Sequence, residues 1–267
     1  MTAQPKASPA EPLVLVTRDE GVTHLTMNRP QARNALSIGL MSALEAAIDE
    51  CAADASTRVV VISGAGPAFC AGHDLKEIRA NPGEAIYRDL FTQCARLMTK
   101  IVRMPKPVIA RVHATATAAG CQLVATCDLA VAAETAQFAT PGVNIGLFCS
   151  TPMVALSRAV GRKASMEMLL TGDMVPAARA RELGLVNRVV PAADLDKTVT
   201  DLAKQIASKS PLTLKIGKEA FYRQVEMPLD DAYAYAAEVM TRNMMTRDAE
   251  EGIDAFVQKR HPTWCGA

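Results

Sequence analysis

The chain has 267 residues, of which 49% are hydrophobic and 21% charged, and its formal net charge is +1. This composition excludes a disordered protein and supports a sizeable core. The near balance of charge gives no reason to expect nucleic acid or an anionic membrane as a partner, and no run approaches the ~18 apolar residues of a membrane-spanning helix. Seven cysteines and four histidines, without a CxxC pair or a His/Cys cluster, predict reduced thiols, a cytoplasmic protein and no metal site.

The first part of the chain alternates predicted strands with predicted helices. Residues 1–12 are rich in proline and alanine, lack the features of a signal or transit peptide, and predict a flexible tail. The segments 13–17 and 22–27 then predict a β-hairpin. Ser37 caps a predicted helix whose apolar face consists of Leu40, Met41, Leu44, Ala47, Ile48 and Cys51. A buried strand is predicted at 58–63.

The pattern continues beyond a turn at 64–67. Asp74 and Glu77 have the spacing of a capping box and mark a helix start. One face of the next predicted helix carries Leu90, Phe91, Cys94, Leu97, Met98 and Ile101. The elements that follow are a strand at 107–112, a helix at 121–126, and short strands at 129–133 and 137–139.

After Thr151 the predicted elements are almost all helices. Thr151 and Pro152 form an N-cap and first-turn pair, Gly161 marks a helix end, and Pro176 marks another start. The predicted helices span about 164–171, 176–183, 193–208, 211–224, 229–245 and 247–260. The fold class is therefore α/β with a helical C-terminal part. Because there is no repeat, low-complexity block or flexible linker, we expect the two parts to pack as a unit.

Two turns rich in small residues, Phe69–Lys76 and Thr117–Gln122, each lead into a helix. Small residues let a ligand approach the main chain, and a helix N-terminus leaves backbone N–H groups unpaired. If both turns face one point, two N–H groups reach one carbonyl oxygen. That arrangement is an oxyanion hole, which stabilises an enolate beside a thioester. The alternative is a pair of ordinary strand-to-helix turns, which most α/β proteins contain.

At these turns the chain resembles the enoyl-CoA hydratase/isomerase (crotonase) family, and the likeness runs from about residue 13 to residue 262. The matching pieces are RNAL at 33–36, AGHDLKE at 71–77, PVIA at 107–110, AGCQL at 119–123, CD at 127–128, AQF at 136–138, LTG at 170–172 and AFVQKR at 255–260. So many matches in order are far more specific than a single motif.

The resemblance implies a spiral of ββα units over residues 13–205 and a helical region at 206–267 that builds a trimer or a dimer of trimers. It implies an acyl-CoA thioester as the ligand, with no cofactor besides the CoA of the substrate. It also implies oxyanion-hole donors at the N–H groups of Ala71 and Ala119. The substrate contacts that it implies are Arg33, Ala35, Leu36, Ala71, Gly72, His73, Asp74 and Gly120, with Phe256 and Lys259 contributed by a neighbouring subunit.

Two positions depart from the family pattern. By this resemblance, hydratases of the family carry one glutamate at the position of Gln122 and a second at the position of Gly142. These two carboxylates hold the attacking water and transfer its proton to the α-carbon. Glutamine does not titrate near neutral pH and glycine has no side chain. We expect Gln122 at the mouth of the site and, opposite it, a gap at Gly142 that water or an anion fills. The subgroup of enoyl-CoA hydratase domain-containing protein 3 departs in the same way, and this chain resembles it closely through the stretches 118–125, 138–144 and 146–152.

Hydration of a 2-enoyl-CoA to a 3-hydroxyacyl-CoA is therefore expected to be weak or absent. Cys149, Ser150, His73 or a bound anion are candidates to replace the glutamates, although Cys149 and His73 also suit plain packing roles, and His113 is interpreted as structural. Three functions stay open. They are a weak or unusual hydratase/isomerase, another reaction at an oxyanion hole such as thioester hydrolysis or decarboxylation, and an acyl-CoA-binding or regulatory protein without turnover.

Overall fold

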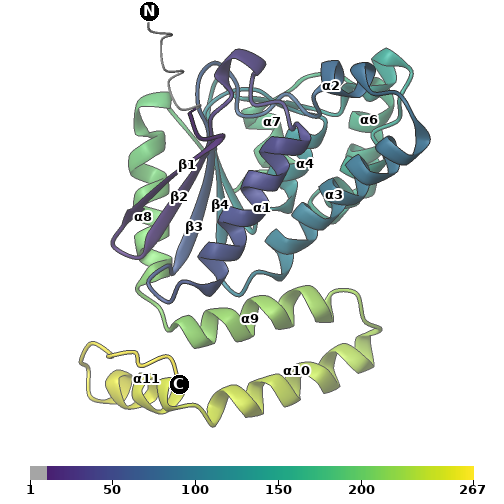
Figure 1. The fold of residues 1–267 in the computed structure, drawn as a ribbon. Coiled ribbons are helices and arrows are strands. Elements are labelled where there is room, and N and C mark those ends of the chain that lie inside the picture. The colour runs from purple at the N-terminus through teal and green to yellow at the C-terminus, as the bar shows by residue number, and fades with distance from the viewer. Residues whose placement is uncertain (1–10) are drawn as a thin grey trace, which may run out of the picture.

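The structure is a computed structural model that describes residues 11–267, so the tail predicted at 1–12 lies almost wholly outside the described residues. Two sheets form its framework, a six-stranded one in the order β1-β2-β3-β4-β6-β9 and a three-stranded one in the order β5-β7-β8 (Figure 1). The strands are β1 (Val14–Asp19), β2 (Val22–Met27), β3 (Val59–Gly64), β4 (Val108–Val112), β5 (Ala116–Thr117), β6 (Leu129–Ala133), β7 (Gln137–Ala139), β8 (Val175–Pro176) and β9 (Arg188–Val190).

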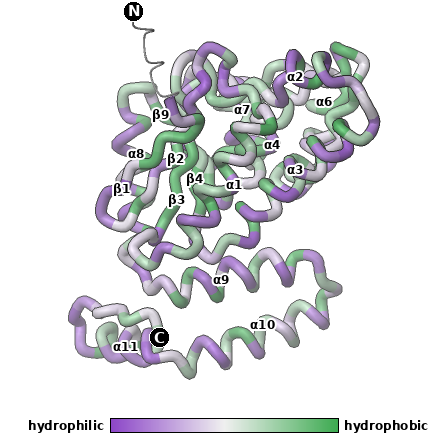
Figure 2. The backbone as a smooth tube through the Cα atoms, viewed as in Figure 1, coloured by the Kyte–Doolittle hydropathy of each residue, from purple (hydrophilic) through white to green (hydrophobic). Residues whose placement is uncertain are grey.

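The large sheet begins with an antiparallel pair and continues in parallel. β1 and β2 pair around a two-residue turn, which confirms the predicted hairpin. From β2 to β9 each neighbouring pair of strands is parallel. Strands of a parallel sheet are buried on both faces and are therefore continuously apolar. Every residue of β3 is buried accordingly, and the central strands are the most hydrophobic part of the backbone in Figure 2.

The chain adds helices in a regular order. The α-helices are α1 (Ile38–Ala53), α2 (Leu75–Ala80), α3 (Glu84–Arg103), α4 (Ala119–Thr126), α5 (Ser150–Ala159), α6 (Arg162–Thr171), α7 (Ala177–Glu182), α8 (Leu195–Ala207), α9 (Pro211–Gln224), α10 (Leu229–Met244) and α11 (Arg247–Val257). Short 3-10 helices lie at η1 (Pro30–Ala32), η2 (Pro141–Ile145) and η3 (Ala192–Asp194). The successions β4–β5–α4 and β6–β7–η2–α5 are ββα units, so the predicted α/β class with such repeats is confirmed.

The two faces of the large sheet are covered by different helices. Val60 and Ile62 of β3 belong to the larger core, which includes residues of α1, α3 and α4. Their neighbours Val59 and Val61 point to the other face and pack with Leu195 and further residues of α8. Alternate residues of a strand face opposite sides, so the body consists of three layers, as Figure 1 shows.

Local capping agrees with the sequence at one helix and differs at two. Ser37 Oγ accepts a hydrogen bond from the Leu40 N–H at 3.1 Å, as predicted. Asp74 caps α2, but the predicted capping box is half formed, because the carboxylate of Glu77 accepts instead from the Ile38 N–H at 3.0 Å. The Thr151 cap is wrong, since α5 begins at Ser150, two residues before the predicted first residue Pro152, and has no side-chain cap.

Three helices at the C-terminus lie away from the sheets. α9 runs beneath the three-layered body, and α10 and α11 lie beneath α9 (Figure 1). No residue of α9 is buried, and in α10 only Val239 is. The predicted boundary between residues 205 and 206 lies near the end of α8, a helix that packs on the large sheet. The division into two regions stays a prediction. Within residues 11–267, no helix combines the length and apolarity needed to cross a membrane.

Candidate functional site

The segment after β3 presents one backbone donor, and it is not the predicted one. The Ala71 N–H donates to the Arg33 carbonyl at 3.0 Å, so the donor role predicted for it is wrong. Leu36 pairs with both neighbours of His73, accepting from the Asp74 N–H and donating to the Gly72 carbonyl. The His73 N–H lies on the other side of this bridge and makes no hydrogen bond within residues 11–267. The neighbouring Gly72 N–H lies against the Cys70 thiol, so the free donor of this segment is His73.

The second donor is the one expected from the sequence. Ala119 is the first residue of α4, and its N–H has no acceptor in the part of the chain that the structure describes. Unpaired N–H groups are a general property of a first helical turn. This N–H group is therefore free to bind a ligand oxygen.

Two glycines bring the donor segments together. A Cβ added at Gly72 would lie 2.9 Å from the Ala118 Cβ and 3.4 Å from the Ala119 nitrogen. A Cβ added at Gly120 would lie 2.1 Å from the Cys70 carbonyl oxygen. Such close approach of two backbones requires glycine. The predicted contacts Gly72 and Gly120 thus hold the two unpaired N–H groups side by side.

Gln122 lies one helical turn after Ala119, on α4. Its side chain is buried, with 4% of the residue exposed, and its Oε1 accepts from Cys94 Sγ of α3 at 3.8 Å. Gln122 therefore lies next to the Ala119 N–H on the same helix, as the sequence predicts for a residue at the oxyanion site. Burial raises the pKa of the Cys94 thiol to about 12, so neither group of this pair titrates near neutral pH.

No gap lies at Gly142, contrary to the expectation. A Cβ added there would lie 2.5 Å from the Leu147 carbonyl oxygen and 2.9 Å from Cys149 Sγ. The segment from η2 to the start of α5 folds back over the position, with the Leu147 N–H donating to the Gly142 carbonyl at 2.9 Å. The space beside Gly142 is thus filled by this protein's own chain.

The candidate replacements at this loop are poorly suited to proton transfer. Cys149 is buried, and burial raises the pKa of its thiol. The Ser150 hydroxyl donates to the Phe148 carbonyl at 3.3 Å and is exposed at the start of α5. A thiol with a raised pKa stays protonated at neutral pH and is a weak nucleophile.

The imidazole of His73 lies between the donor segment and α3. Its ring meets Phe91 edge to face, with 5.6 Å between centroids. Neither ring nitrogen has a hydrogen-bond partner in the described residues. Burial lowers the pKa of this imidazole and outweighs the nearby Leu36 backbone, which raises it, so the imidazole is neutral near pH 7. His113, in contrast, bonds the Gly66 carbonyl at 2.8 Å through Nε2, which agrees with its structural interpretation.

Of the predicted CoA contacts at 33–36 and at Asp74, some have structural roles and others are accessible to a ligand. Leu36 is fully buried, and Asp74 caps α2 and accepts from Arg29 at 2.9 Å. Burial raises the pKa of the Asp74 carboxyl group, but the Arg29 guanidinium and two N–H groups outweigh burial and lower it overall. The side chain of Arg33 is exposed, and Ala35 is half-buried.

Two residues that the sequence did not single out organise this segment. Asn34 is fully buried, and its amide donates to the carbonyls of Ala65 and Ala68 while accepting from the Arg29 N–H. Arg29 also donates to the Ala35 carbonyl at 2.6 Å. The asparagine of the RNAL stretch at 33–36 therefore holds this segment in place.

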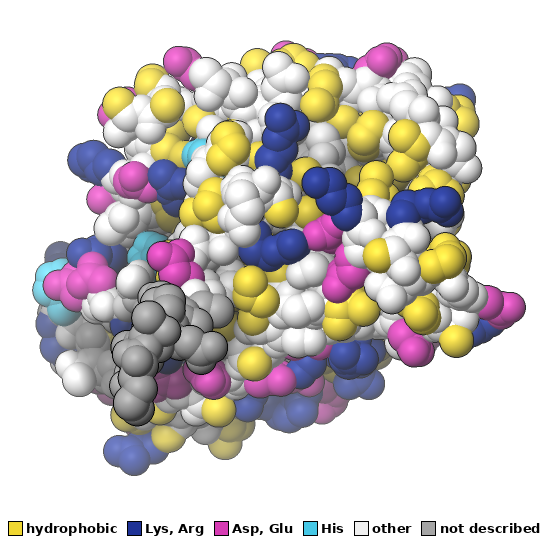
Figure 3. Space-filling view, turned by 45° about the horizontal axis from the view of Figure 1, so that its top comes forward, with side chains coloured by type: hydrophobic (Ala, Val, Ile, Leu, Met, Phe, Trp, Pro, Cys, Tyr) yellow, Lys and Arg dark blue, Asp and Glu magenta, His cyan; other side chains and the backbone are white. Residues whose placement is uncertain are grey.

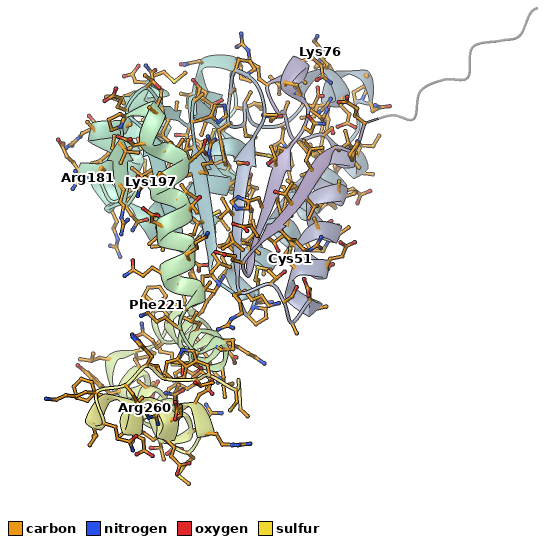
Figure 4. The ribbon with its side chains drawn as sticks, turned by 90° about the vertical axis from the view of Figure 1, so that its left-hand side faces the viewer. Cys51, Lys76, Arg181, Lys197, Phe221 and Arg260 are labelled. Carbon is orange, nitrogen blue, oxygen red and sulfur yellow. The ribbon has the colours of Figure 1, made fainter. Side chains whose placement is uncertain are left out.

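Phe256 and Lys259 lie at the opposite end of the chain from the donors. Figure 4 places Lys76, just past the donor segment, at the top of the molecule and Arg260, just past α11, at the bottom. Phe256 is 85% exposed. These two predicted contacts therefore do not share a site with His73 and Ala119 within one chain. The described residues also contain no group of three or more His, Cys, Asp or Glu side chains placed to hold a metal.

Comparisons with known proteins agree with this architecture. A family model for enoyl-CoA hydratase/isomerase matches residues 17–267. Proteins named enoyl-CoA hydratase domain-containing protein 3, mitochondrial, from Rattus norvegicus and Xenopus laevis are 44% and 46% identical, covering 98% and 95% of this chain and 88% and 86% of their own length.

Solved structures give the same result. A structure of enoyl-CoA hydratase from Mycobacterium smegmatis has a TM-score of 0.93 and 55% identity, covering 95% of this chain and 99% of that one. Human enoyl-CoA hydratase domain-containing protein 3 has a TM-score of 0.92 and 44% identity, covering 94% and 100%.

The names of the relatives overturn one prediction. The cytoplasmic location was inferred from unpaired thiols, yet relatives 44–46% identical are named as mitochondrial proteins. Reduced thiols indicate the redox conditions in which a protein works and do not by themselves specify a compartment. The prediction of a cytoplasmic protein is therefore wrong.

Proposed function

The chain belongs to the enoyl-CoA hydratase/isomerase (crotonase) family and shares the features of the subgroup of enoyl-CoA hydratase domain-containing protein 3, and from this premise we propose that it binds acyl-CoA thioesters. The observation that carries the proposal is the pair of unpaired backbone N–H groups at His73 and Ala119, held together by close contacts at Gly72 and Gly120. Two donors aimed at one carbonyl oxygen stabilise it most when it becomes an oxyanion.

The surroundings suit a ligand with an apolar tail and a phosphorylated head. Arg33 is exposed beside the donor segment. On the end of the molecule that Figure 3 turns toward the viewer, Lys and Arg side chains are interspersed with hydrophobic ones. Guanidinium groups pair well with phosphates, and lysine also binds them. These features support binding of the CoA thioester class without specifying the acyl group.

Hydration of a 2-enoyl-CoA is a minor activity in this proposal. A hydratase needs carboxylates to move the protons of water, whereas Gln122 is uncharged and the space at Gly142 is filled by Leu147 and Cys149. General acid–base groups typically contribute about 10²–10⁴-fold each. We therefore assign to the site carbonyl binding and polarisation, with slow hydration.

Titration calorimetry with two ligands that differ only in the carbonyl group tests the proposal. Butyryl-CoA carries the thioester oxygen, and its thioether analogue butyl-CoA does not. Because two hydrogen bonds are worth roughly 1–3 kcal/mol together, we expect butyryl-CoA to bind in the micromolar range and roughly tenfold or more tightly than butyl-CoA. Equal affinities, or no binding of either, would rule out the oxyanion hole.

The same preparation is assayed for loss of the enoyl-thioester absorbance of crotonyl-CoA. A rate at least ~10³-fold below that of a glutamate-bearing hydratase is expected, because both acid–base groups are missing. An ordinary hydratase rate would show that the catalytic positions are wrongly assigned.

We also propose that the complete CoA site spans two subunits. Phe256 and Lys259 are exposed. They lie next to Arg260, which Figure 4 places at the opposite end of the molecule from Lys76 and the donor segment. A trimer, or a dimer of trimers, would bring α11 of one copy to the donor segment of the next. Phe256 would then contact the nucleotide part of CoA.

A further inference from the structure

An imidazole at the oxyanion site is left unused by carbonyl binding alone. The N–H of His73 is one of the two proposed donors, and the imidazole belongs to the same residue. Both ring nitrogens are buried without a partner in the described residues. A buried polar atom without a hydrogen bond destabilises the fold, and such groups call for an explanation, of which a catalytic role or an unseen ligand is one.

The ring lies on the acyl side of the site. It packs against Phe91 of α3. Cys94 follows one helical turn later on the same face of α3 and contacts the Gln122 side chain. Gln122 stands where relatives of the hydratase type carry a proton-transferring glutamate, so this side of α3 borders the reacting carbons. His73 therefore approaches the acyl group from the same wall of the site as Gln122.

The other titratable groups near the donors are unavailable as bases. The carboxylate of Asp74 is paired with Arg29 and caps α2. Burial raises the pKa of the thiols of Cys70 and Cys94 to about 12, and it also raises that of Cys149. Among these groups only the imidazole has a ring nitrogen that is neither ion-paired nor hydrogen-bonded, and it can accept a proton near neutral pH because it is uncharged there.

We propose that His73 is the catalytic base of this site and that it removes a proton from the α-carbon of a bound acyl-CoA thioester. The Cα–H bond breaks and its proton goes to an imidazole nitrogen. The electron pair forms the enolate double bond, and the carbonyl π electrons move to the oxygen held by the N–H groups of His73 and Ala119. Return of a proton from the imidazolium to the α-carbon reverses the step, so no co-reactant is needed. This inference rests on the proposed function.

The experiment measures exchange of α-protons for deuterium. Butyryl-CoA is incubated with the protein in D2O, and its mass is followed with time. We expect wild type to incorporate deuterium and His73→Phe to lose roughly 10²-fold or more of that rate, the usual contribution of a general base. His73→Phe keeps the backbone N–H and the aromatic contact with Phe91, so its affinity for butyryl-CoA should change little. His73→Gln serves as a second variant that retains polarity without titrating.

A matched control is His24→Gln. His24 lies on β2, two residues after Val22, whose side chain packs with α8 on the face of the sheet away from α4. The His24→Gln variant should exchange the α-protons of butyryl-CoA at the same rate as wild type. Thermal unfolding and calorimetry with butyryl-CoA confirm that each variant is folded and binds.

The outcomes separate the two proposals. If butyryl-CoA binds no more tightly than butyl-CoA, the proposed function fails and this inference fails with it. If binding depends on the carbonyl but wild type does not exchange, or both His73 variants exchange as fast as wild type, the base assignment alone is overturned. Adding butyryl-CoA should shift the ring ¹⁵N resonances of His73 and leave those of His24 unchanged. This measurement does not depend on the exchange rate.

Discussion

At the scale of single residues, Gly142 has no room for a side chain. An added Cβ would lie 2.5 Å from a backbone oxygen, that of Leu147, and 2.9 Å from Cys149 Sγ. Backbone cannot move aside as a flexible side-chain end can. Restoring a hydratase-like glutamate at this position therefore requires the segment from η2 to α5 to be rebuilt, in addition to a change at Gln122.

A glycine-to-alanine pair measures this constraint. Because overpacking typically costs ~1–3 kcal/mol, Gly142→Ala should lower the free energy of unfolding by about that amount in urea titrations. Gly217→Ala is the control, since Gly217 lies within α9 with no atom within 4 Å of its added Cβ. Alanine there should stabilise by about 0.4–1 kcal/mol. If both variants behave alike, the loop over Gly142 is adaptable and a gap can open.

The donors show what the sequence reveals and what it hides at this scale. Both follow a residue with positive φ, Gly72 at 94° before His73 and Ala118 at 50° before Ala119. That geometry turns the next N–H outward. A glycine in a turn is a readable signal, and it would have pointed to His73 instead of Ala71. Ala118 gives no such signal, because alanine rarely adopts this conformation, and Ala119 was found by resemblance.

At the scale of secondary-structure elements, Asp128 is the main link between α9 and the body. Its carboxylate accepts from the Val108 N–H at 2.7 Å, from Lys218 Nζ at 2.7 Å and from the Tyr222 hydroxyl at 2.9 Å. Lys218 also donates to two carbonyls, and its side chain is only 7% exposed. Since α9 has no buried apolar residue, this polar cluster replaces a hydrophobic anchor.

Removing one partner of this cluster should release α9. Asp128→Ala leaves a buried Lys218 ammonium unpaired, which typically costs about 3–5 kcal/mol, measured by urea unfolding. Amide hydrogen exchange should become faster in α9 while it stays slow in the large sheet. The control is Glu226→Ala, which breaks the pair with Arg158 at 2.9 Å near the same helix. That pair is more than half exposed on both sides, so its loss should cost at most about 1 kcal/mol. Equal costs would contradict the anchoring role.

Long elements were predictable from sequence, whereas most of the shortest strands were not, although the three-residue strand β7 was predicted at its observed bounds. The periodic apolar positions of α1 and α3 identified both helices, and Ser37 fixed the start of α1. The strands β5, β8 and β9 have two or three residues each, too few for a period-two pattern, and their pairing depends on partners distant in the chain. Phe91 was assigned to the buried face of α3, but it is partly exposed beside His73.

At the scale of the whole molecule, the C-terminal helices leave apolar side chains in water. The exposed large hydrophobic residues of α9 to α11 and their connections include Phe221, Val225, Leu229, Tyr233, Met240, Met244, Met245, Ile253, Phe256 and Val257. Apolar surface gathered in this way usually marks an interface between proteins. Most soluble oligomers are closed assemblies of identical subunits, and a second copy of the chain would cover this surface.

Sedimentation or light scattering at micromolar concentration tests the assembly. We expect a mass of three or six times the 28.5 kDa of one chain. Leu229 and Tyr233 lie one turn apart on α10 and are 71% and 72% exposed, so the double change Leu229→Glu with Tyr233→Glu should lower the mass by placing charge in a desolvated interface. Leu15→Glu, on the exposed side of β1, is the control and should leave the mass unchanged. A wild-type monomer would refute the trimer. It would also remove the basis for a CoA site shared between subunits, because Lys76, just past the donor segment, and Arg260, just past α11, lie at opposite ends of the molecule.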